Sequence, residues 1–164
     1  MNHDPAPSRI ALLHPGAMGT AIGAALVSNG HHVGWCDADR SRETAERATA
    51  FQRFEALDAL ASWAEACMSV VPPHAAIDTA QAVADAGFKG VYVDANAISP
   101  ETAGRVHRLV EAAGATYVDG GIIGPPPRDR GASRLYLAEG AHGQHARNVA
   151  ALFVDSTFEA PVLT

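Results

Sequence analysis

The sequence of 164 residues lacks the features that mark secreted, membrane-spanning or nucleic-acid-binding proteins. Its two cysteines, Cys36 and Cys67, lie far apart in apolar, strand-like runs, so we expect buried free thiols rather than a disulfide. No apolar run approaches the roughly 20 residues that a membrane-spanning helix needs. The chain has 12 basic and 18 acidic residues, a formal net charge of −6 and no basic cluster. These absences predict a cytoplasmic protein with neither a membrane nor a nucleic acid as its partner.

The start of the chain does not resemble a targeting segment. Residues 1–8 have neither the charge nor the apolar stretch of a signal peptide, so we expect a flexible tail. Residues 9–164 suit one domain, and the 48% of hydrophobic residues in the chain suffice for its core. No internal repeat or low-complexity linker divides them.

A glycine-rich turn follows the first apolar run. Residues 10–13 suit a strand buried on both faces of a parallel sheet, and apolar residues between 21 and 26 recur at helical spacing. Between them, Gly16 leaves room for a pyrophosphate to approach the first N–H groups of the helix, and Gly19 lets the helix pack close to the strand. This pattern predicts the first strand–turn–helix unit of a dinucleotide-binding fold.

The turn departs from the usual glycine pattern at its first position, where His14 replaces a glycine. Pro15 follows and has no N–H, so we expect His14 to be extended and the turn to differ from the usual one. An ordinary strand–turn–helix without a nucleotide therefore stays open as an alternative.

An acidic residue ends the second predicted strand. Asp37 stands 18 residues after Gly19, close to the spacing at which a carboxylate meets the ribose hydroxyls of NAD. Arg40, Ser41 and Arg42 follow, and they could hold the 2′-phosphate of NADP instead. Ser41 also stands where a helix N-cap is expected. The choice between NAD and NADP stays open.

Helices and strands alternate along the rest of the chain. Further strands are expected at residues 54–56, 67–71, 91–94, 115–119, 134–138 and 158–163. Helices are expected at 41–50, 57–66 and 75–86, from Pro100 onward, and at 142–153. The helix at 57–66 carries Trp63, which we assign to the core. This alternation predicts an α/β fold of the Rossmann type, with a doubly wound, mostly parallel sheet and helices on both faces.

Ligands of such sheets bind at the carboxyl ends of the strands. The fourth strand ends at Val71, Pro72 and Pro73, and Asn96 follows the fifth. Because an amide can donate and accept hydrogen bonds, Asn96 either faces a ligand or holds a structural turn. The segment 120–127 is rich in glycine and proline, and we expect an irregular, stiff loop that forms a wall of the substrate site.

The eight histidines do not predict a metal site. His31 and His32 are adjacent, so they point to opposite faces of a strand, and His142 with His145 has no matching carboxylate or thiol pair. No catalytic triad can be inferred either. We therefore assign no metal ligand and no catalytic residue.

Several motifs together carry a resemblance to a known family. They are His-Pro-Gly-Ala-Met-Gly at 14–19, Val-Pro-Pro at 71–73, Asp-Ala-Asn-Ala-Ile-Ser-Pro at 94–100 and Asp-Gly-Gly-Ile-Ile-Gly-Pro-Pro-Pro at 119–127. In this order they resemble the β-hydroxyacid dehydrogenase and phosphogluconate dehydrogenase superfamily, and most of all a bacterial branch of NAD(P)-dependent oxidoreductases. The resemblance covers essentially the whole chain.

The resemblance implies a cofactor, NADP or NAD, and a small-molecule substrate. It places the pyrophosphate at Gly16, Ala17, Met18 and Gly19. It places the adenosine end at Asp37, Arg40 and Ser41, and the nicotinamide at Val71, Pro72, Pro73 and Asn96. The substrate loop of the family corresponds to Gly120, Gly121, Ile123 and Gly124.

Two departures from the family bear on activity. Ile123 stands where better-known relatives have a serine that holds the substrate carboxylate, which disfavours a simple 3-hydroxy acid as substrate. The family continues into a long helix with the catalytic lysine and a second, helical domain. This chain ends at Thr164, and its only lysine, Lys89, lies between two glycines before a strand.

We therefore expect the N-terminal cofactor domain of an oxidoreductase that transfers hydride between nicotinamide and a small carbonyl, hydroxy or imine substrate. The domain should be inactive alone, and its exposed apolar surface predicts self-association, for example as a homodimer. Two alternatives remain. The chain could be a non-catalytic NAD(P)-binding or sensing module, or a fold that uses the same glycine turn and acid for S-adenosylmethionine.

Overall fold

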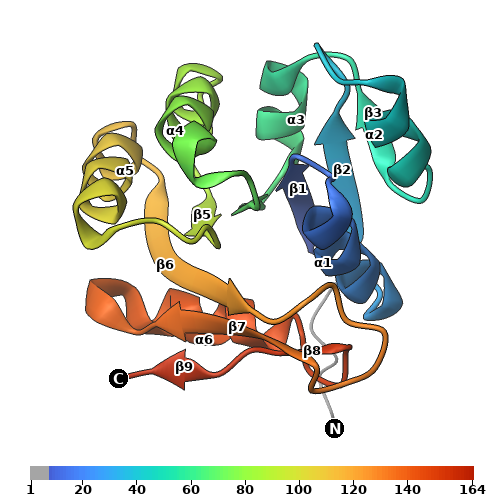
Figure 1. Cartoon of the computed structure of the whole chain (residues 1–164). Coiled ribbons are helices and arrows are strands. Elements are labelled where there is room, and N and C mark those ends of the chain that lie inside the picture. Colours follow the sequence, from blue (N-terminus) through green and yellow to red (C-terminus); the bar gives the residue numbers. More distant parts are fainter. Residues whose placement is uncertain (1–7) are drawn as a thin grey trace, which may run out of the picture.

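The computed structural model describes residues 8–164, and within them one nine-stranded sheet carries helices on both faces (Figure 1). The strands are β1 (Arg9–Leu13), β2 (His32–Cys36), β3 (Gln52–Phe54), β4 (Ala66–Ser69), β5 (Val91–Asp94), β6 (Thr116–Ile123), β7 (Ser133–Ala138), β8 (Phe158–Glu159) and β9 (Val162–Leu163). The α-helices are α1 (Ala17–Ser28), α2 (Arg42–Arg47), α3 (Leu57–Trp63), α4 (Ala76–Asp85), α5 (Pro100–Ala112) and α6 (Gly143–Ala151). Two short 3₁₀ helices, η1 (Pro73–Ala75) and η2 (Gly140–His142), precede α4 and α6.

The strand order along the sheet is β3-β2-β1-β4-β5-β6-β7-β8, and β9 pairs with β7. The strands from β3 through β6 are all parallel, and their order is that of dinucleotide-binding sheets. β7 is antiparallel to β6, whereas β8 and β9 are parallel to β7. The doubly wound, mostly parallel sheet that the sequence predicts is confirmed.

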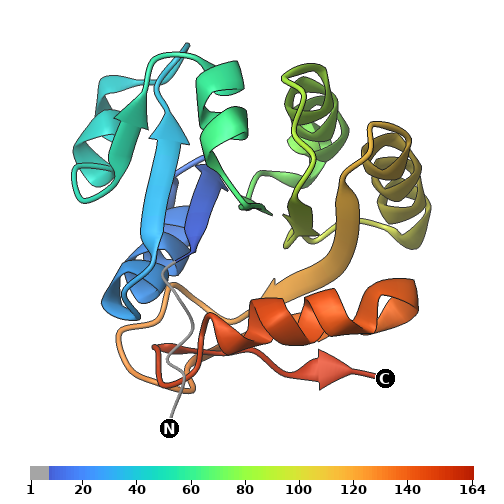
Figure 2. The same ribbon diagram turned by 180° about the vertical axis from the view of Figure 1, so that it is seen from behind.

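Two hydrophobic clusters lie on opposite faces of the sheet. Ile10 and Leu12 of β1 belong to the cluster that α1 and α6 cover. Ala11 and Leu13 belong to the cluster that α3, α4 and α5 cover. All four side chains are at most 6% exposed, so the first strand is buried on both faces, as predicted. Seen from behind, the orange helix α6 lies along the end of the sheet that β7 and β9 form (Figure 2).

Three further features bear on the predictions from the sequence, namely the expected tail, the position of Trp63 and the start of α5. Residues 1–7 of the expected tail lie outside the described residues, while the carbonyl oxygen of Ser8 accepts a hydrogen bond from the His32 N–H at 2.9 Å. Trp63 is partly buried and packs against the core as predicted, with its ring centroid 5.2 Å from that of Phe54. Ser99 caps α5 by accepting a hydrogen bond from the Thr102 N–H at 3.2 Å.

The prediction of an irregular loop at 120–127 is wrong for the first four of these residues. Gly120 to Ile123 continue β6 and pair with β7, with Gly120 opposite Leu137 and Ile123 opposite Arg134. This pairing satisfies backbone groups that an irregular loop would leave to water. Glycine is required at position 120, because a Cβ there would lie 2.9 Å from the carbonyl oxygen of Tyr136. Only the segment from Gly124 onward is irregular.

Several predicted element boundaries also need correction. The last predicted strand, 158–163, is split into β8 and β9, because Pro161 between them has no N–H for a ladder hydrogen bond. The third strand spans Gln52–Phe54 rather than 54–56, since Gln52 pairs with Gly34. α3 ends at Trp63, because the chain enters the β4 ladder at Ala66.

Candidate functional site

The chain turns sharply after β1, at His14. This residue has a φ of +70°, so the prediction that it is extended is wrong. The N–H of Gly16 donates to the carbonyl oxygen of His14 at 2.9 Å and closes a three-residue turn around Pro15. Closing this turn directly after a buried strand outweighs the extended preference that a following proline imposes. His14 thus adopts the left-handed backbone conformation for which glycine is usually chosen.

Helix α1 begins in this turn with free donors. Gly16 is its N-cap residue and offers no side-chain cap, and its first turn carries no acidic side chain. The N–H groups of Ala17, Met18 and Gly19 therefore have no partner inside the helix. A Cβ at Gly19 would overlap with the carbonyl oxygen of His14, so only glycine allows this close approach. Unpaired N–H groups at the positive end of a helix dipole fit a pyrophosphate, so these residues suit the cofactor that the sequence implies.

The segment after β2 lies beside this turn. Arg40 Nη1 is 3.3 Å from His14 Nδ1. Burial, and then the positive charges of Arg40 and Arg47, lower the pKa of His14, which keeps the imidazole neutral at neutral pH. The Asp37 carboxylate is paired with the Arg53 guanidinium. Three arginines thus lie around the place where the sequence predicts the adenosine end.

Ser41 is the N-cap of α2, which is one of the two roles that the sequence suggests for it. Its hydroxyl oxygen accepts a hydrogen bond from the Thr44 N–H at 3.2 Å and caps α2. The same hydroxyl lies 3.0 Å from Thr44 Oγ1, and either group can be the donor in that contact.

Asn96 joins the ends of β4 and β5. Its side-chain amide donates to the Asp94 carboxylate at 2.7 Å and the Ser69 hydroxyl at 3.0 Å, and its carbonyl oxygen accepts from the Val71 N–H at 2.7 Å. The side chain is only 5% exposed. These hydrogen bonds hold a structural turn, and because the residue also lines a cavity described below, its ligand-facing role stays a prediction.

The end of β4 carries the proline pair. Val71 is held by Asn96, and Pro72 and Pro73 lead into η1 and α4. All three residues lie at the carboxyl edge of the sheet, where the sequence places them.

Three strand ends bring their polar side chains together. Ser69, Asp94 and Asp119 occupy matching positions of β4, β5 and β6, because the parallel register pairs Ser69 with Asp94 and Asp94 with Asp119. The Tyr117 hydroxyl lies 3.4 Å from Asp94 Oδ2 and 3.3 Å from Asp119 Oδ1. Burial raises the pKa of Asp94 to about 6, against the hydrogen bonds from Asn96, which lower it.

Sequence reasoning did not assign Ser69, Asp94 and Tyr117 to the site. A signal was present, because each is polar and lies in a predicted parallel strand. Only the register, however, shows that their side chains meet.

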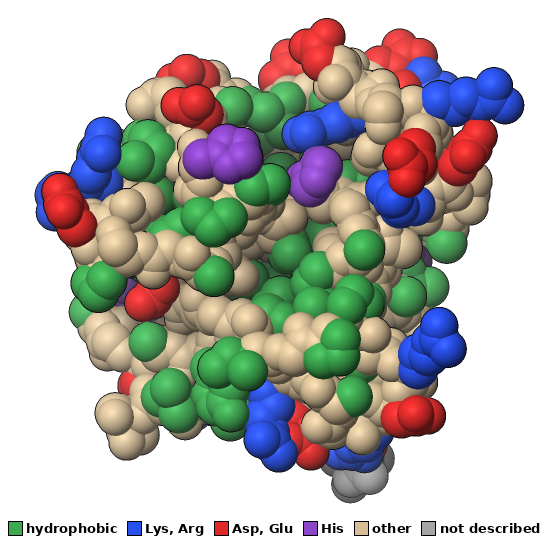
Figure 3. Space-filling model, in the orientation of Figure 1, with side chains coloured by type: hydrophobic (Ala, Val, Ile, Leu, Met, Phe, Trp, Pro, Cys, Tyr) green, Lys and Arg blue, Asp and Glu red, His purple; other side chains and the backbone are tan. Residues whose placement is uncertain are grey.

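A cavity of about 540 Å³ opens beside these strand ends, and we call it the glycine-strand cavity. Its lining includes four residues that the sequence assigns to the cofactor or substrate, namely Asn96, Gly120, Gly121 and Ile123. A space-filling view shows a hollow at the centre of the molecule, with hydrophobic side chains on its floor and histidine and basic side chains on its upper rim (Figure 3). Gly124 has a φ of +120° and lies against Ser133, outside the cavity lining.

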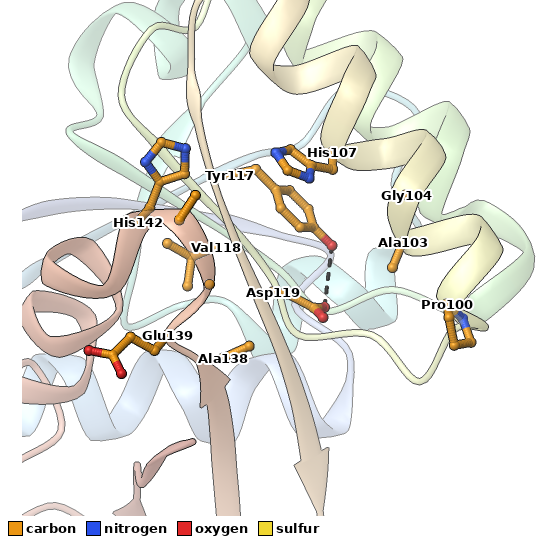
Figure 4. Close-up of a pocket in the computed structure, with 12 residues that line it drawn as sticks. Pro100, Ala103, Gly104, His107, Tyr117, Val118, Asp119, Ala138, Glu139 and His142 are labelled. Carbon is orange, nitrogen blue, oxygen red and sulfur yellow. Dashed lines mark hydrogen bonds between the residues drawn. The ribbon is translucent and has the colours of Figure 1, made fainter. Parts of the chain in front are cut away.

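A second cavity, of about 290 Å³, lies between α5, β6 and η2, and we call it the histidine cavity (Figure 4). His107 and His142 line it together with Tyr117 and Asp119. His107, Glu111 and His142 bring their ligand atoms within 4.8 Å of one another. Sequence reasoning missed this cluster, because Glu111 lies 31 residues before His142 and meets it only through the fold.

Two residue types outside these cavities behave as the sequence suggests. Lys89 donates to the carbonyl oxygen of Ala113, on the approach to β5, and lines neither cavity. Both cysteines are free; Cys67 is buried, which raises the pKa of its thiol, and Cys36 is half-buried. Among residues 8–164, no helix is long and apolar enough to cross a membrane.

Comparisons with known proteins agree with this geometry. The family model for the NAD-binding domain of 6-phosphogluconate dehydrogenase matches residues 9–155. A search of curated proteins found no significant match.

Solved structures give the same picture of the fold. The chain is similar to a 3-hydroxyisobutyrate dehydrogenase from Mycobacterium tuberculosis, solved with L-serine, with a TM-score of 0.80 and 21% identity over 95% of this chain and 54% of that one. It is similar to MTH1747, a conserved protein of unknown function described as structurally similar to 3-hydroxyacid dehydrogenases, with a TM-score of 0.76 and 26% identity over 93% and 57%. It is also similar to a reductive aminase from Aspergillus terreus in complex with NADPH and ethyl levulinate, with a TM-score of 0.76 and 19% identity over 96% and 55%. The chain thus spans a little over half the length of these structures.

Proposed function

Because the chain belongs to the family of NAD-binding domains of 6-phosphogluconate dehydrogenase, we propose that it is the cofactor domain of an NAD(P)-dependent oxidoreductase. The reaction of the whole enzyme is hydride transfer between the nicotinamide and a small carbonyl, hydroxy or imine substrate. The domain comprises residues 9–164 and works in the cytoplasm. The observation that carries this proposal is the turn at residues 14–19, where an uncapped helix N-terminus meets a glycine that no other residue can replace.

The chain's own residues have three tasks in this reaction. The N–H groups of Ala17, Met18 and Gly19 donate to the pyrophosphate, since they are the unpaired donors of α1. Asn96 fixes the ends of β4 and β5 beside the glycine-strand cavity. Gly120 and Gly121 line this cavity without side chains that would narrow it, and nothing lies within 4 Å of a Cβ placed on Gly121. When bound, the dinucleotide supplies or accepts the hydride.

Activity of this domain alone is not expected. Hydride transfer to a carbonyl or imine needs a proton donor near the substrate. Among residues 8–164, the only lysine lies outside the glycine-strand cavity. Asp94, whose pKa is raised by burial, is 1% exposed and is engaged by Asn96. Neither residue is thus placed to give the proton, and for this reason we expect the domain alone to be inactive.

Within this proposal, NADP is the preferred cofactor. The Asp37 carboxylate is already paired with Arg53, which weakens it as an acceptor for ribose hydroxyls. Arg40 lies next to the glycine turn and offers a guanidinium to a 2′-phosphate. Ser41 adds a hydroxyl that donates to the phosphate when Thr44 is the donor in the contact between the two hydroxyl groups.

Calorimetric titration with NADPH and NADH tests both the function and the preference. We expect NADPH to bind more tightly, and Arg40→Ala to weaken NADPH binding about tenfold while leaving NADH binding nearly unchanged, because one charge-assisted contact is lost. Arg105→Ala, at an exposed arginine of α5, is the matched control. Binding of neither dinucleotide would contradict the function, whereas equal losses for both in Arg40→Ala would contradict only the preference.

Self-association completes the proposal. Ile123 is 67% exposed and Leu163 is 53% exposed, and both line the glycine-strand cavity. Exposed apolar side chains grouped in this way favour a homodimer. Sedimentation at high concentration should show a dimer, and a strictly monomeric profile would count against it.

A further inference from the structure

Two histidines and one glutamate converge at the edge of the histidine cavity. His107 and Glu111 lie one turn apart on α5, so their side chains share one face of that helix. His142 lies at the end of η2 and contacts Glu111, and Figure 4 shows His107 and His142 among the residues that line the cavity. We propose that His107, Glu111 and His142 form a binding site for a divalent transition-metal ion.

The separations between the three ligand atoms suit one ion. His142 Nε2 lies 3.0 Å from Glu111 Oε1, and His107 Nε2 lies 3.8 Å from the same oxygen. All three ligand atoms lie within 4.8 Å of one another. An ion that binds nitrogen and oxygen at about 2.0–2.2 Å in tetrahedral geometry holds its ligands about 3.4 Å apart. The two distances to the carboxylate oxygen lie on either side of this value, so the two rings must adjust their positions to bind one ion.

Two of the ligands are held in place by Tyr117. The Tyr117 N–H donates to Glu111 Oε1 at 3.0 Å and fixes the carboxylate. The ring of His107 stacks on the Tyr117 ring, with centroids 4.9 Å apart and planes at 13°. Figure 4 shows this ring beside His107, with its hydroxyl pointing to Asp119. Groups that orient metal ligands in this way raise metal affinity, because less freedom is lost on binding.

The donor set selects the class of ion. Two imidazoles with one carboxylate suit zinc, cobalt or nickel, whereas calcium and magnesium prefer oxygen ligands alone. The three side chains are 46%, 35% and 34% exposed, so an ion there stays in contact with solvent. Three protein ligands leave at least one position of a tetrahedral ion open, and the histidine cavity of about 290 Å³ adjoins it. A water molecule or a small anion fits this position.

The site is separate from the proposed cofactor site. His107 and Glu111 lie in the last two turns of α5, and Tyr117 lies near the start of β6. The cofactor residues instead follow the carboxyl ends of β1, β2, β4 and β5. A bound ion would therefore link α5 to the segment before α6 without contact with the dinucleotide.

A plain ion pair between the histidines and Glu111 is the competing explanation, and its pH dependence has the opposite sign. An ion pair needs protonated imidazoles and weakens as the pH rises. Metal binding needs neutral imidazoles and strengthens as the pH rises.

Calorimetric titration of the tag-free chain with zinc chloride tests the proposal. We expect one saturable zinc ion per chain at pH 7.5, and binding at least about tenfold weaker at pH 6, because protons compete with the metal for its ligands. His107→Ala, His142→Ala and Glu111→Gln should each weaken binding by at least about tenfold, because each removes one ligand or its charge. Glu111→Gln keeps an acceptor for the Tyr117 N–H, so it separates ligand loss from loss of structure.

His145→Ala provides the matched control. His145 lies next to His142 in space, with ring centroids 6.1 Å apart, and is not part of the cluster. Zinc affinity of this variant should stay within about twofold of the parent chain. The proposal is overturned if no saturable zinc binding is found, if His145→Ala loses as much affinity as His142→Ala, or if Glu111→Gln binds zinc as tightly as the parent chain.

Discussion

Two glycine-rich segments of this molecule look alike in sequence and do different things. In the turn after β1, Gly19 brings the start of α1 against the His14 carbonyl group, and the backbone N–H groups stay unpaired. In β6, Gly120 and Gly121 lie in a strand whose backbone groups pair with β7. In the first segment, glycine allows a turn whose backbone N–H groups stay free for a ligand. In the second segment, glycine leaves the glycine-strand cavity wide because it has no side chain. The neighbouring backbone, and not the glycine itself, decides which role results.

The largest expected effect is at the turn. Gly19→Ala should weaken NADPH binding by at least about 100-fold, because the added methyl group overlaps the His14 carbonyl oxygen and displaces the start of α1. Gly104→Ala is the matched control, since a Cβ there has only an ordinary contact at 3.5 Å with the Arg108 side chain. Calorimetry gives the affinities, and circular dichroism confirms that both variants fold. Equal NADPH affinity of the two variants would contradict the role of the turn.

The next effect concerns the polar strand ends between the two glycine segments. The pKa of Asp94 is raised from 3.8 to about 6, mainly by burial. Between these values the folded chain keeps a proton that the unfolded chain releases, so the free energy of unfolding falls as the pH rises through this range. The parent chain should lose about 2 kcal/mol of its free energy of unfolding in this way, and Asp94→Asn should not lose it, because an amide does not titrate. The amide oxygen of the variant can still accept a hydrogen bond from Asn96.

Urea denaturation at pH 4.5 and pH 7 measures this difference. Asp85→Asn, at an exposed aspartate that accepts from Gln81 at 2.8 Å, is the control and should follow the parent chain. A parallel pH dependence of Asp94→Asn and the parent chain would show that Asp94 is not the titrating group.

The smallest effect separates the two glycines of β6. Gly120→Ala should lower the free energy of unfolding by about 1–2 kcal/mol, because its Cβ would crowd the Tyr136 carbonyl oxygen at 2.9 Å. Gly121→Ala should change it by less than about 0.5 kcal/mol, since nothing lies within 4 Å of its Cβ. Neither change should alter NADPH affinity as Gly19→Ala does. Similar losses in the free energy of unfolding at both positions, measured by urea denaturation, would show that the two glycines of β6 do not differ in this way.

The sequence predicts the parts of this fold that depend on local pattern. The apolar run of β1, the helical spacing of α1 and the N-cap at Ser41 each lie within a few residues, and the structure has all three. The backbone of His14 was mispredicted, because the rule for a residue before proline is weaker than closure of the turn.

Features that depend on pairing between distant segments could not be predicted. Gly120 to Ile123 become a strand only because β7 lies beside them. Asn96 meets Ser69 through the parallel register of β4 and β5, and Glu111 meets His142 through the packing of η2 against α5 and β6. None of these contacts has a signature within a short window of sequence.

Amide NMR spectra recorded during a titration with NADPH report which backbone N–H groups meet the dinucleotide. We expect the signals of residues 16–19 to shift most, with smaller shifts at Arg40 and Asn96 and none at His107 or His142. Binding that leaves the signals of residues 16–19 unchanged would show that the turn after β1 does not hold the pyrophosphate, and the absence of any shift at saturating NADPH would show that the domain does not bind this dinucleotide.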